Sequence, residues 1–264
     1  MLMNTVLKAI TLTTDFGYAD WFVGAMKGVI LSICPRAAVV DISHGVPAGD
    51  IISGAFVIRE AYSFYPAGTV HVCVVDPGVG GGRAAIAVRT GRFLFVGPDN
   101  GLMSPACSDD GIDEIISIDN PDFMLENVST TFHGRDIFAP AAAHLAAGVP
   151  LDALGRRVEA MAALDAGSVR REGRIMEGRV IYIDHFGNLI TNIHGDDISS
   201  GRVSVEVGGA SVPGLFASYS SAETGGALAL IGSGGYLEIS VNGGSAEERL
   251  GAGSGSTVRV IIDK

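Results

Sequence analysis

Cysteine, basic residues and long apolar runs are all scarce in this sequence of 264 residues. The three cysteines, Cys34, Cys73 and Cys107, are an odd number without CxxC spacing, which is typical of reduced thiols, and two of them lie in apolar runs that predict burial. No stretch approaches the roughly 18 consecutive apolar residues of a membrane helix, and the N-terminal residues lack the apolar core and cleavage site of a signal peptide. We therefore predict a cytoplasmic protein without a membrane partner.

Basic residues are fewer than acidic ones: 18 Lys and Arg against 29 Asp and Glu give a formal net charge of -11. Such a surface repels polyanions, which argues against a nucleic-acid partner and favours a neutral or cationic small ligand. Apolar residues are abundant, at 47%, and so are glycines, at 37 positions. This composition predicts a globular protein with a sizeable core and many tight turns, and the length allows two domains.

The N-terminal half alternates between short β-rich runs and helical ones. The pattern predicts strands at 8–15, 38–43 and 69–76, helices at 21–34 and 51–65 between them, and two further strands at 84–90 and 93–99. Asp20 is placed to cap the first helix, and Pro35 ends it. The βαβαβ order predicts a doubly wound α/β sheet, whose ligands collect at the carboxyl ends of strands, here marked by Asp15, Ser43 and Asp76.

The C-terminal part has a different character. Short alternating strands separated by glycine turns are predicted at 178–184, 189–194, 202–209, 227–232, 236–241 and 257–263. They predict a smaller all-β barrel domain without a long helix. We place the α/β domain at residues 1–160, a polar linker at 161–175 and the barrel domain at 176–264.

The loop DPGVGGGR joins Asp76 to Arg83 across six positions, four of them glycine. It resembles a phosphate loop only superficially, because it lacks the GK[ST] ending and leads into a strand instead of a helix N-terminus. Its glycines let the two charges meet, and a guanidinium beside a carboxylate favours the ionised form. Two interpretations stay open at this point: a turn with a structural ion pair, or a charged site.

Two more segments of the first half carry polar groups. In TTDFGYAD, Asp15 ends a strand, where a carboxylate could accept both hydroxyls of a ribose diol, and Asp20 is either a cap or a ligand. In TFHGRDIFAP, His133 and Arg135 precede a helix that Asp136 could cap, with Pro140 in its first turn. Carboxylates and an imidazole also suit a divalent cation, although no HxH or HExxH spacing occurs.

The second half offers two patches. IDHFGN places Asp184, Phe186 and Asn188 between strands, either as an ordinary turn or as an adenine site, because an amide can pair with the base edge and an aromatic ring can pack on it. GSGGYLEIS brings Ser233 and Glu238 to a glycine turn at a strand start, which alone is weak evidence of a site.

Seven motifs, TTDFG, ISHGVPAGDI, VVDPGVGGGR, GPDNGLM, TFHGRDIFAP, IDHFGN and GSGGYLEIS, occur in one order along the chain. These motifs and their order resemble those of the S-adenosylmethionine (SAM) hydroxide adenosyltransferase family, and the resemblance covers nearly the whole chain. That family is related to the nucleophilic fluorinase and chlorinase. The resemblance implies that water or hydroxide attacks C5′ of SAM and yields adenosine, L-methionine and a proton.

The resemblance also implies roles for particular residues. The catalytic residues would be Asp76, Arg83 and His133, and Asp15 would hold the ribose. The remaining substrate contacts would come from Asp20, Asp184, Phe186, Asn188, Ser233 and Glu238. No metal and no cofactor are expected, SAM being the substrate. Family members are trimers with active sites between subunits, so a homotrimer is expected.

Two positions depart from the pattern of the family and its relatives. Gly49 stands where the family usually has an aromatic over the ribose, and Gly234 where the halogenases have an arginine; Tyr219 could supply stacking instead. Three other functions are kept open: a non-catalytic binder of SAM or adenosine, a halide-using adenosyl transferase and a metal-dependent phosphohydrolase. The pair Asp76 and His133 favours water over halide, because a bare carboxylate repels an anion.

Overall fold

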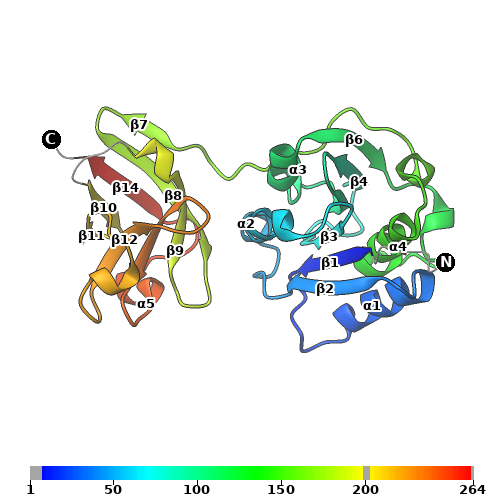
Figure 1. Cartoon of the computed structure of the whole chain (residues 1–264), viewed down its shortest axis with the longest axis horizontal. Helices are drawn as coiled ribbons and strands as arrows, with labels where there is room; N and C mark the ends of the chain where they lie inside the picture. Colours follow the sequence, from blue (N-terminus) through cyan, green and yellow to red (C-terminus); the bar gives the residue numbers. More distant parts are fainter. Residues whose placement is uncertain (1–7, 199–202, 263–264) are drawn as a thin grey trace, which may run out of the picture. The chain divides into compact units, whose positions relative to one another are not determined.

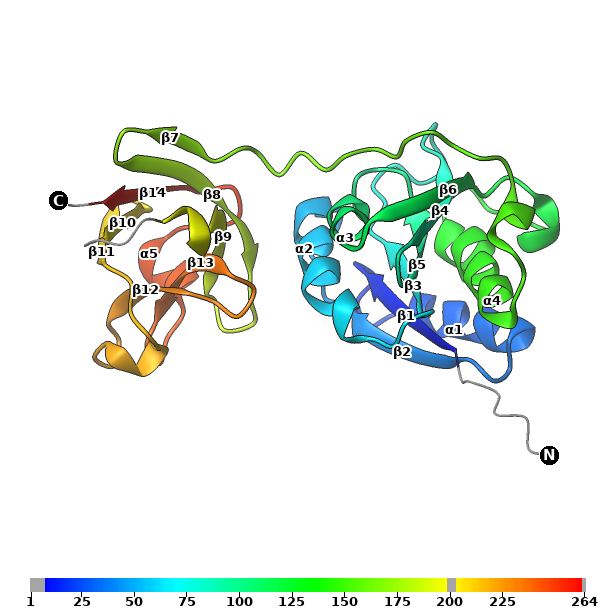
Figure 2. The same cartoon turned by 45° about the horizontal axis from the view of Figure 1, so that its top comes forward.

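The structure is a computed structural model that describes residues 8–198 and 203–262. The chain divides into two compact units, Met1–Leu164 and Asp165–Lys264, and the division falls inside the segment 161–175 that the sequence suggests as a linker. Figures 1 and 2 show an α/β unit at the N-terminal end and an all-β unit at the C-terminal end. Each unit has its own hydrophobic core, and each is described by itself.

The first unit is built on a six-stranded mixed sheet with the order β2-β1-β3-β5-β4-β6. Its strands are β1 (Ala9–Thr14), β2 (Ala38–Ser43), β3 (Val70–Val74), β4 (Ala85–Thr90), β5 (Leu94–Pro98) and β6 (Ile112–Ser117). The four strands β2, β1, β3 and β5 run parallel, whereas β4 is antiparallel to both of its neighbours. All five residues of β3 are buried, as the continuous apolar run predicts for a central strand covered on both faces.

Helices cover both faces of this sheet (Figure 1), so the predicted doubly wound α/β domain is confirmed. The helices are α1 (Phe22–Ile33), α2 (Ile51–Ala61), α3 (Ser104–Asp110) and α4 (Ala139–Ala147). One core packs α1 and α4 against the sheet, with Met26 and Ile30 fully buried, and the other packs α2 and α3, with Ile58 and Cys107 fully buried. Among the described residues no helix has the length and apolar character needed to cross a membrane.

The ends of the helices differ from two predictions. Asp20 does not cap the first helix, because α1 begins one residue later than expected, with Trp21 at its N-cap and no side-chain capping bond. The second helix ends at Ala61 and continues as a 3₁₀ turn, Tyr62–Phe64, so the predicted span to residue 65 is too long. Its start is capped by Asp50, whose Oδ1 accepts a hydrogen bond from the Ser53 amide at 3.0 Å.

The second unit is an antiparallel sheet with the order β11-β10-β14-β8-β9-β13-β12 and with β7 on β8. Its strands are β7 (Arg170–Glu172), β8 (Ile175–Ile183), β9 (Leu189–His194), β10 (Val203–Val207), β11 (Ala210–Pro213), β12 (Ala227–Ile231), β13 (Tyr236–Val241) and β14 (Thr257–Ile262). After β11 the chain reaches β12, where the Phe216 amide donates to the Ala229 carbonyl at 2.8 Å. The contact nearly closes the sheet, and the predicted barrel domain is confirmed.

Three short elements of this unit had no signal in the sequence. These are β7, a three-residue strand inside the suggested linker, β11, and the helix α5 (Ala246–Leu250). All three residues of β7 are exposed, so no apolar alternation marks it, and it exists because it pairs with β8. Two predicted strand ends, Arg202 and Asp263, lie outside the described residues.

One buried residue of the first sheet gives the fold a dependence on pH. His71 of β3 is fully buried; its Nδ1 lies 2.8 Å from Thr11 Oγ1, and its ring stacks on Phe95 with centroids 5.0 Å apart. Its Nε2 has no hydrogen-bond partner among the described residues. Burial therefore lowers the pKa of His71 from 6.5 to about 4.

We expect acid to destabilise the first unit through His71. Between pH 6.5 and about 4 the unfolded chain binds a proton that the folded chain excludes, so the free energy of unfolding falls as pH falls. From pH 7 to pH 5 the loss is about 2 kcal/mol. Urea unfolding followed by fluorescence of Trp21, the single tryptophan, should show a loss that is smaller by about 2 kcal/mol in His71→Phe than in the wild type. Parallel pH dependence in the two proteins would contradict the assignment.

Candidate active site

Three chain segments bring charged residues to one edge of the first sheet. Asp15 directly follows β1 and Asp76 follows β3 by two positions, so both lie at the carboxyl ends of parallel strands. Arg83 shortly precedes β4, and β4 runs antiparallel to β5 with Ala85 opposite Pro98. The start of β4 therefore lies at the same edge as the ends of the parallel strands, where α/β sheets bind their ligands.

Asp76 and Arg83 form a bidentate ion pair. Arg83 Nε lies 3.1 Å from Oδ1 and 3.0 Å from Oδ2 of Asp76, and Arg83 Nη2 also donates to Oδ2. Only 5% of the Asp76 side chain and 11% of the Arg83 side chain are exposed. A carboxylate has about four acceptor positions, so these three hydrogen bonds leave a position on Oδ1 for a further donor.

The glycines of the loop allow this pairing. Gly80 has φ +73°, and a Cβ there would lie 2.2 Å from the Thr130 carbonyl oxygen, so only glycine fits. At position 78 a Cβ would make only ordinary van der Waals contact, at 3.8 Å from Asp76 Oδ1. The loop is thus folded back on itself and packed against the segment that leads to His133.

His133 completes the group in space. Arg83 Nη2 lies 2.7 Å from His133 Nδ1, and because a guanidinium only donates, Nδ1 accepts and the neutral ring carries its hydrogen on Nε2. Burial lowers the pKa of His133, the charge of Arg83 lowers it further, and the acids Asp76 and Asp136 only partly oppose this. The imidazole is therefore neutral near pH 7.

A turn of π-helix, Gly134–Phe138, follows His133 directly, and such turns are frequent at functional sites. The expectation that Asp136 caps the next helix is wrong, because Asp136 lies inside this turn and Phe138 is the N-cap of α4. Pro140 does lie in the first turn of α4. The buried Asp136 carboxylate accepts hydrogen bonds from Arg135 Nε at 2.6 Å and from the Ser129 amide at 2.8 Å. It fixes the chain around His133.

Three of the four residues considered as metal ligands are bonded to arginine side chains in the structure. Of the candidate ligands Asp15, Asp76, His133 and Asp136, the second and third are both bonded to Arg83, and Asp136 is bonded to Arg135. Over residues 8–198 and 203–262, no three His, Cys, Asp or Glu side chains are grouped as a metal ion would require. The cationic guanidinium bonded to both central residues would also repel a divalent cation.

A cavity of about 280 Å³ opens beside the group formed by Asp76, Arg83 and His133. It is lined by Asp15, Phe16, Phe22, Val74, Asp76, Val79, Thr131, Phe132, His133 and Gly134. The aromatic rings pack on one another, with Phe22 and Phe132 centroids 5.2 Å apart. This aromatic wall was not predicted from the sequence, although Phe16 directly follows TTD and Phe132 directly precedes HGRD.

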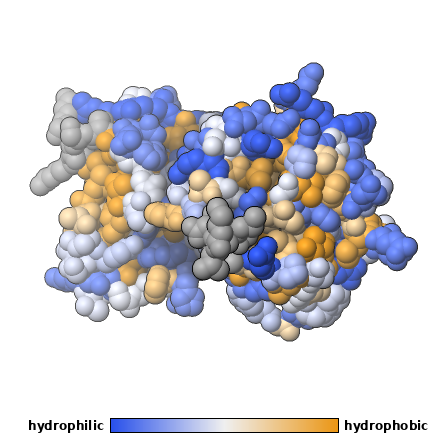
Figure 3. All heavy atoms as spheres, turned by 45° about the vertical axis from the view of Figure 1, so that its right-hand side comes forward, coloured by the Kyte–Doolittle hydropathy of each residue, from blue (hydrophilic) through white to orange (hydrophobic). Residues whose placement is uncertain are grey.

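The surface coloured by hydropathy in Figure 3 shows apolar residues among the hydrophilic ones on the face that is drawn.

Asp20 lies apart from this group. It is exposed on the loop before α1 and is not among the residues that line the cavity. Asp15 does line it, and its Oδ2 accepts a hydrogen bond from the Gly49 amide at 2.8 Å. Gly49 has φ +72°, a conformation that strains any residue with a side chain.

Two residues of the GPDNGLM motif hold backbone segments of the first unit in place. Asn100 Nδ2 donates to the Val75 carbonyl at 2.9 Å, which fixes the backbone immediately before Asp76. Asp99 Oδ1 accepts from the Ala162 amide at 2.7 Å and ties down the end of the first unit. Neither role could be assigned from the sequence, where Asp99 is the last residue of a predicted strand and Asn100 follows it.

The second unit contains a cavity of about 490 Å³ lined by Asp184, Phe186, Asn188, Tyr219, Val241, Gly243 and Gly244. Asp184 Oδ1 accepts from the amides of Phe186 and Asn188, each at 2.9 Å, and Oδ2 accepts from Asn188 Nδ2 at 2.8 Å. This turn leaves the Phe186 ring 73% exposed at the cavity. The structure therefore brings three of the predicted substrate-binding residues together on one turn.

Glu238 and Ser233 are placed differently. Glu238 is buried and accepts hydrogen bonds from the Tyr219 hydroxyl and from Ser240 Oγ, each at 2.8 Å. Burial and Glu238 together raise the pKa of Tyr219 to about 12. Glu238 does not line the cavity but holds Tyr219, which does. Ser233 is exposed in the turn between β12 and β13.

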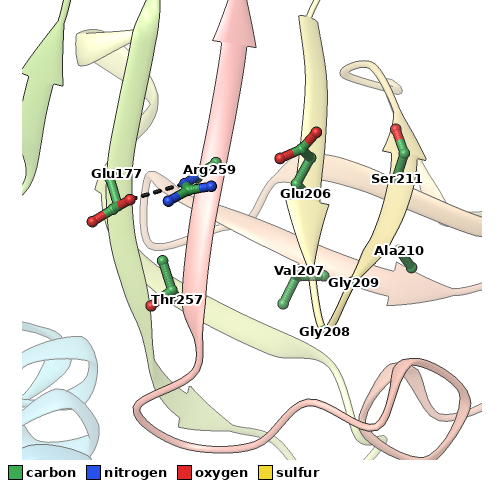
Figure 4. A pocket seen from close by; sticks show the side chains of 9 residues that line it. All are labelled: Glu177, Glu206, Val207, Gly208, Gly209, Ala210, Ser211, Thr257 and Arg259. Carbon is green, nitrogen blue, oxygen red and sulfur yellow. Dashed lines mark hydrogen bonds and ion pairs between the residues drawn. The ribbon is translucent and has the colours of Figure 1, made fainter.

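A third cavity, of about 470 Å³, lies on the second unit (Figure 4) and contains none of the predicted site residues. It is lined by Glu177, Glu206, Val207, Gly208, Gly209, Ala210, Ser211, Thr257 and Arg259. Arg259 Nε lies 2.9 Å from Glu177 Oε2, and Glu206 faces Arg259 from the neighbouring strand. The row is a cross-strand charge ladder of the kind that stabilises sheet surfaces.

Both units of the chain are similar to proteins of known families. Residues 10–155 match the SAM hydroxide adenosyltransferase N-terminal domain, and residues 178–259 match the C-terminal domain of the same family. A protein of Salinispora arenicola named (R)-S-adenosyl-L-methionine hydrolase is 42% identical over 95% of this chain and 97% of its own length. A fluorinase of Nocardia brasiliensis is 29% identical over 96% of each chain.

A solved structure has the same fold. The crystal structure of an uncharacterized conserved protein from Thermotoga maritima aligns with a TM-score of 0.88 and 35% sequence identity. The alignment covers 96% of this chain and 99% of that one. The similarity therefore extends through both units.

Proposed function

The chain belongs to the SAM hydroxide adenosyltransferase family, and from this membership and the geometry of the first unit we propose that it hydrolyses SAM to adenosine and L-methionine. One observation carries the proposal: Asp76, Arg83 and His133 form one hydrogen-bonded chain beside the cavity that Asp15 also lines. A pure binding protein has no need of this chain of groups.

The reaction is a displacement at C5′. A water oxygen attacks C5′, the C5′–S bond breaks, and its electron pair stays on sulfur as the thioether of methionine. Because the sulfonium is already a good leaving group, the protein needs only to position the water in line with the bond. The water donates one hydrogen to the open position on Asp76 Oδ1, which takes the proton released by the attack.

His133 and Arg83 keep Asp76 in this role. Arg83 fixes the carboxylate through two donor groups, and the neutral His133 in turn accepts from Arg83. With its hydrogen on Nε2, the imidazole can donate to the attacking water or pass the proton on. Asp15 provides a carboxylate at the cavity that can accept both hydroxyls of the ribose. The relatives' names specify the (R) sulfonium, and we propose the same epimer for this chain.

The second unit supplies the adenine and methionine contacts in this proposal. Its turn with Phe186 exposed and Asn188 beside it suits an adenine ring, and Asp184 and Tyr219 line the same cavity. The first unit's cavity of about 280 Å³ is small for a ligand of this size, because such sites usually span about 300–1,000 Å³. We propose a homotrimer in which one subunit's first unit and the next subunit's second unit complete each site, with Asp20, Ser233 and Glu238 as supporting residues.

The proposed reaction uses no metal and no organic cofactor, and the proposed place of action is the cytoplasm, where free cysteines such as Cys73 and Cys107 stay reduced. Purified protein incubated with SAM should release adenosine and methionine in equal amounts, measured by chromatography. Adenosine at the level of the protein-free control would refute hydrolysis. Activity that disappears with EDTA and returns with a divalent cation would support a metal-dependent enzyme instead.

We expect adenosine to remain the product in the presence of halide. Asp76 Oδ1 needs a hydrogen donor, and water offers one whereas fluoride and chloride do not. In 1 M sodium chloride or 0.1 M sodium fluoride, mass spectrometry should detect adenosine and no 5′-halo-5′-deoxyadenosine. A halogenated product that grows with halide concentration would identify the chain as a halide-using transferase, like the more distant relatives named fluorinase.

A further inference from the structure

The loop after β2, which carries the ISHGVPAGDI motif, has no part in the chemistry proposed above, yet it contacts the loop that carries Asp15. His44 is the centre of these contacts. Its side chain is fully buried, and its ring Nδ1 lies 2.7 Å from Thr14 Oγ1. Its backbone carbonyl accepts a hydrogen bond from the Gly17 amide at 2.8 Å.

The other side of the His44 ring faces an acid. Nε2 lies 3.1 Å from Asp41 Oδ1, near enough for electrostatic attraction, but outside hydrogen-bond geometry. Asp41 Oδ2 accepts from Lys27 Nζ of α1 at 2.7 Å, so the acid itself is held in place. The Tyr18 ring packs edge-on against the His44 ring, with ring centroids 4.9 Å apart.

These contacts fix Asp15 from both sides. The residue before it, Thr14, bonds the His44 ring, and Gly17, two residues after it, bonds the His44 carbonyl. Thr14 Oγ1 also accepts from the Phe16 amide at 3.2 Å, which shapes the turn directly after Asp15. The Asp15 carboxylate itself accepts from Gly49 of the same His44 loop. The direction of the carboxylate thus depends on how the two loops are joined.

We propose that His44 is a positioning residue for ribose recognition, which aims the Asp15 carboxylate through Thr14. The inference rests on the proposed function in one respect, the assignment of Asp15 to the ribose diol. An apolar residue could fill the buried space, but it would leave Thr14 Oγ1 and Asp41 Oδ1 without the imidazole between them. The imidazole reaches both because its two nitrogens lie on opposite sides of the ring.

The test measures binding of nucleosides by calorimetry, so it does not depend on turnover. The wild type should bind adenosine more tightly than 2′-deoxyadenosine, and His44→Ala should reduce this preference by about tenfold. His44→Asn should retain part of it, because the amide can reach Thr14 Oγ1. Thr14→Val, which keeps the volume of the side chain, should resemble His44→Ala. His144→Ala is the matched control, because the His144 ring packs on Phe123 of another segment.

With SAM as substrate, the same variants should raise KM and leave kcat within about threefold, because Asp76 and its partners are untouched. Circular dichroism and thermal melting confirm that each variant is folded. An unchanged preference in folded Thr14→Val and His44→Asn, or a wild type that does not distinguish the two nucleosides, overturns the assignment. If the wild type prefers adenosine and the His44 and Thr14 variants lose this preference, but SAM is not hydrolysed, the proposed function is refuted and the role of His44 is supported.

Discussion

Asp76→Asn is expected to lower kcat for SAM hydrolysis by about 10²–10⁴-fold, the usual contribution of a general base. An amide cannot take the proton of the attacking water, and its NH₂ group would oppose the Arg83 donors that now bond both carboxylate oxygens. KM should change much less, because the proposed ribose and adenine contacts are made by other residues. Initial rates of adenosine release, measured by chromatography at saturating SAM, give both quantities.

A second ion pair of the same domain provides the control. Asp109 pairs with Arg59 Nε at 2.5 Å, but both side chains are more than a third exposed and do not line the cavity. Asp109→Asn should therefore keep the wild-type kcat. If Asp76→Asn retains more than about a tenth of the activity, a general-base role for Asp76 is untenable.

Arg83→Met is expected to cost a comparable factor in kcat and also to change the pH profile. Arg83 is one of two causes that lower the pKa of His133, and its removal leaves Asp76 unpaired beside the ring, so the pKa of His133 rises. Once protonated, His133 can no longer pass on the proton released from the attacking water, whether or not Arg83 is present. In the wild type the acid limb of kcat/KM should therefore lie below pH 6.5, the ordinary value for histidine.

The measurement is the kcat/KM profile of both proteins from pH 5 to pH 9. The acid limb of Arg83→Met should move to higher pH, whereas Arg59→Met, which removes the control arginine, should leave both the rate and the limb unchanged. A limb that stays in place or moves to lower pH in Arg83→Met would contradict the assigned effect of Arg83 on His133.

The sheet and the barrel could be predicted because their signals are local. The alternation of strands and helices over residues 8–99 requires only the period of the apolar residues and the caps. The pairing of Asp76 with Arg83 was also within reach, since the glycines between them permit the loop to close. What local pattern could not give was the direction of β4, which places Arg83 at the same edge as Asp15.

Side-chain roles set by distant contacts could not be read from the sequence. Asp136 was expected to cap a helix but bonds Ser129 across a loop, and the contact of Glu238 with Tyr219 had no signal in the sequence. The role of His44 depends on Thr14, a residue 30 positions away on a neighbouring strand. Such contacts arise from sheet order, so they become visible only once the strands are placed.

The origin of the 5′ oxygen tests the central claim most directly, because attack of water at C5′ makes a bond that no other route makes. Protein and SAM incubated in ¹⁸O-labelled water should yield adenosine heavier by the mass of one label, carried at the 5′-hydroxyl, together with unlabelled methionine. Adenosine that forms without the label, or no adenosine above the protein-free control, would contradict displacement by water held at Asp76.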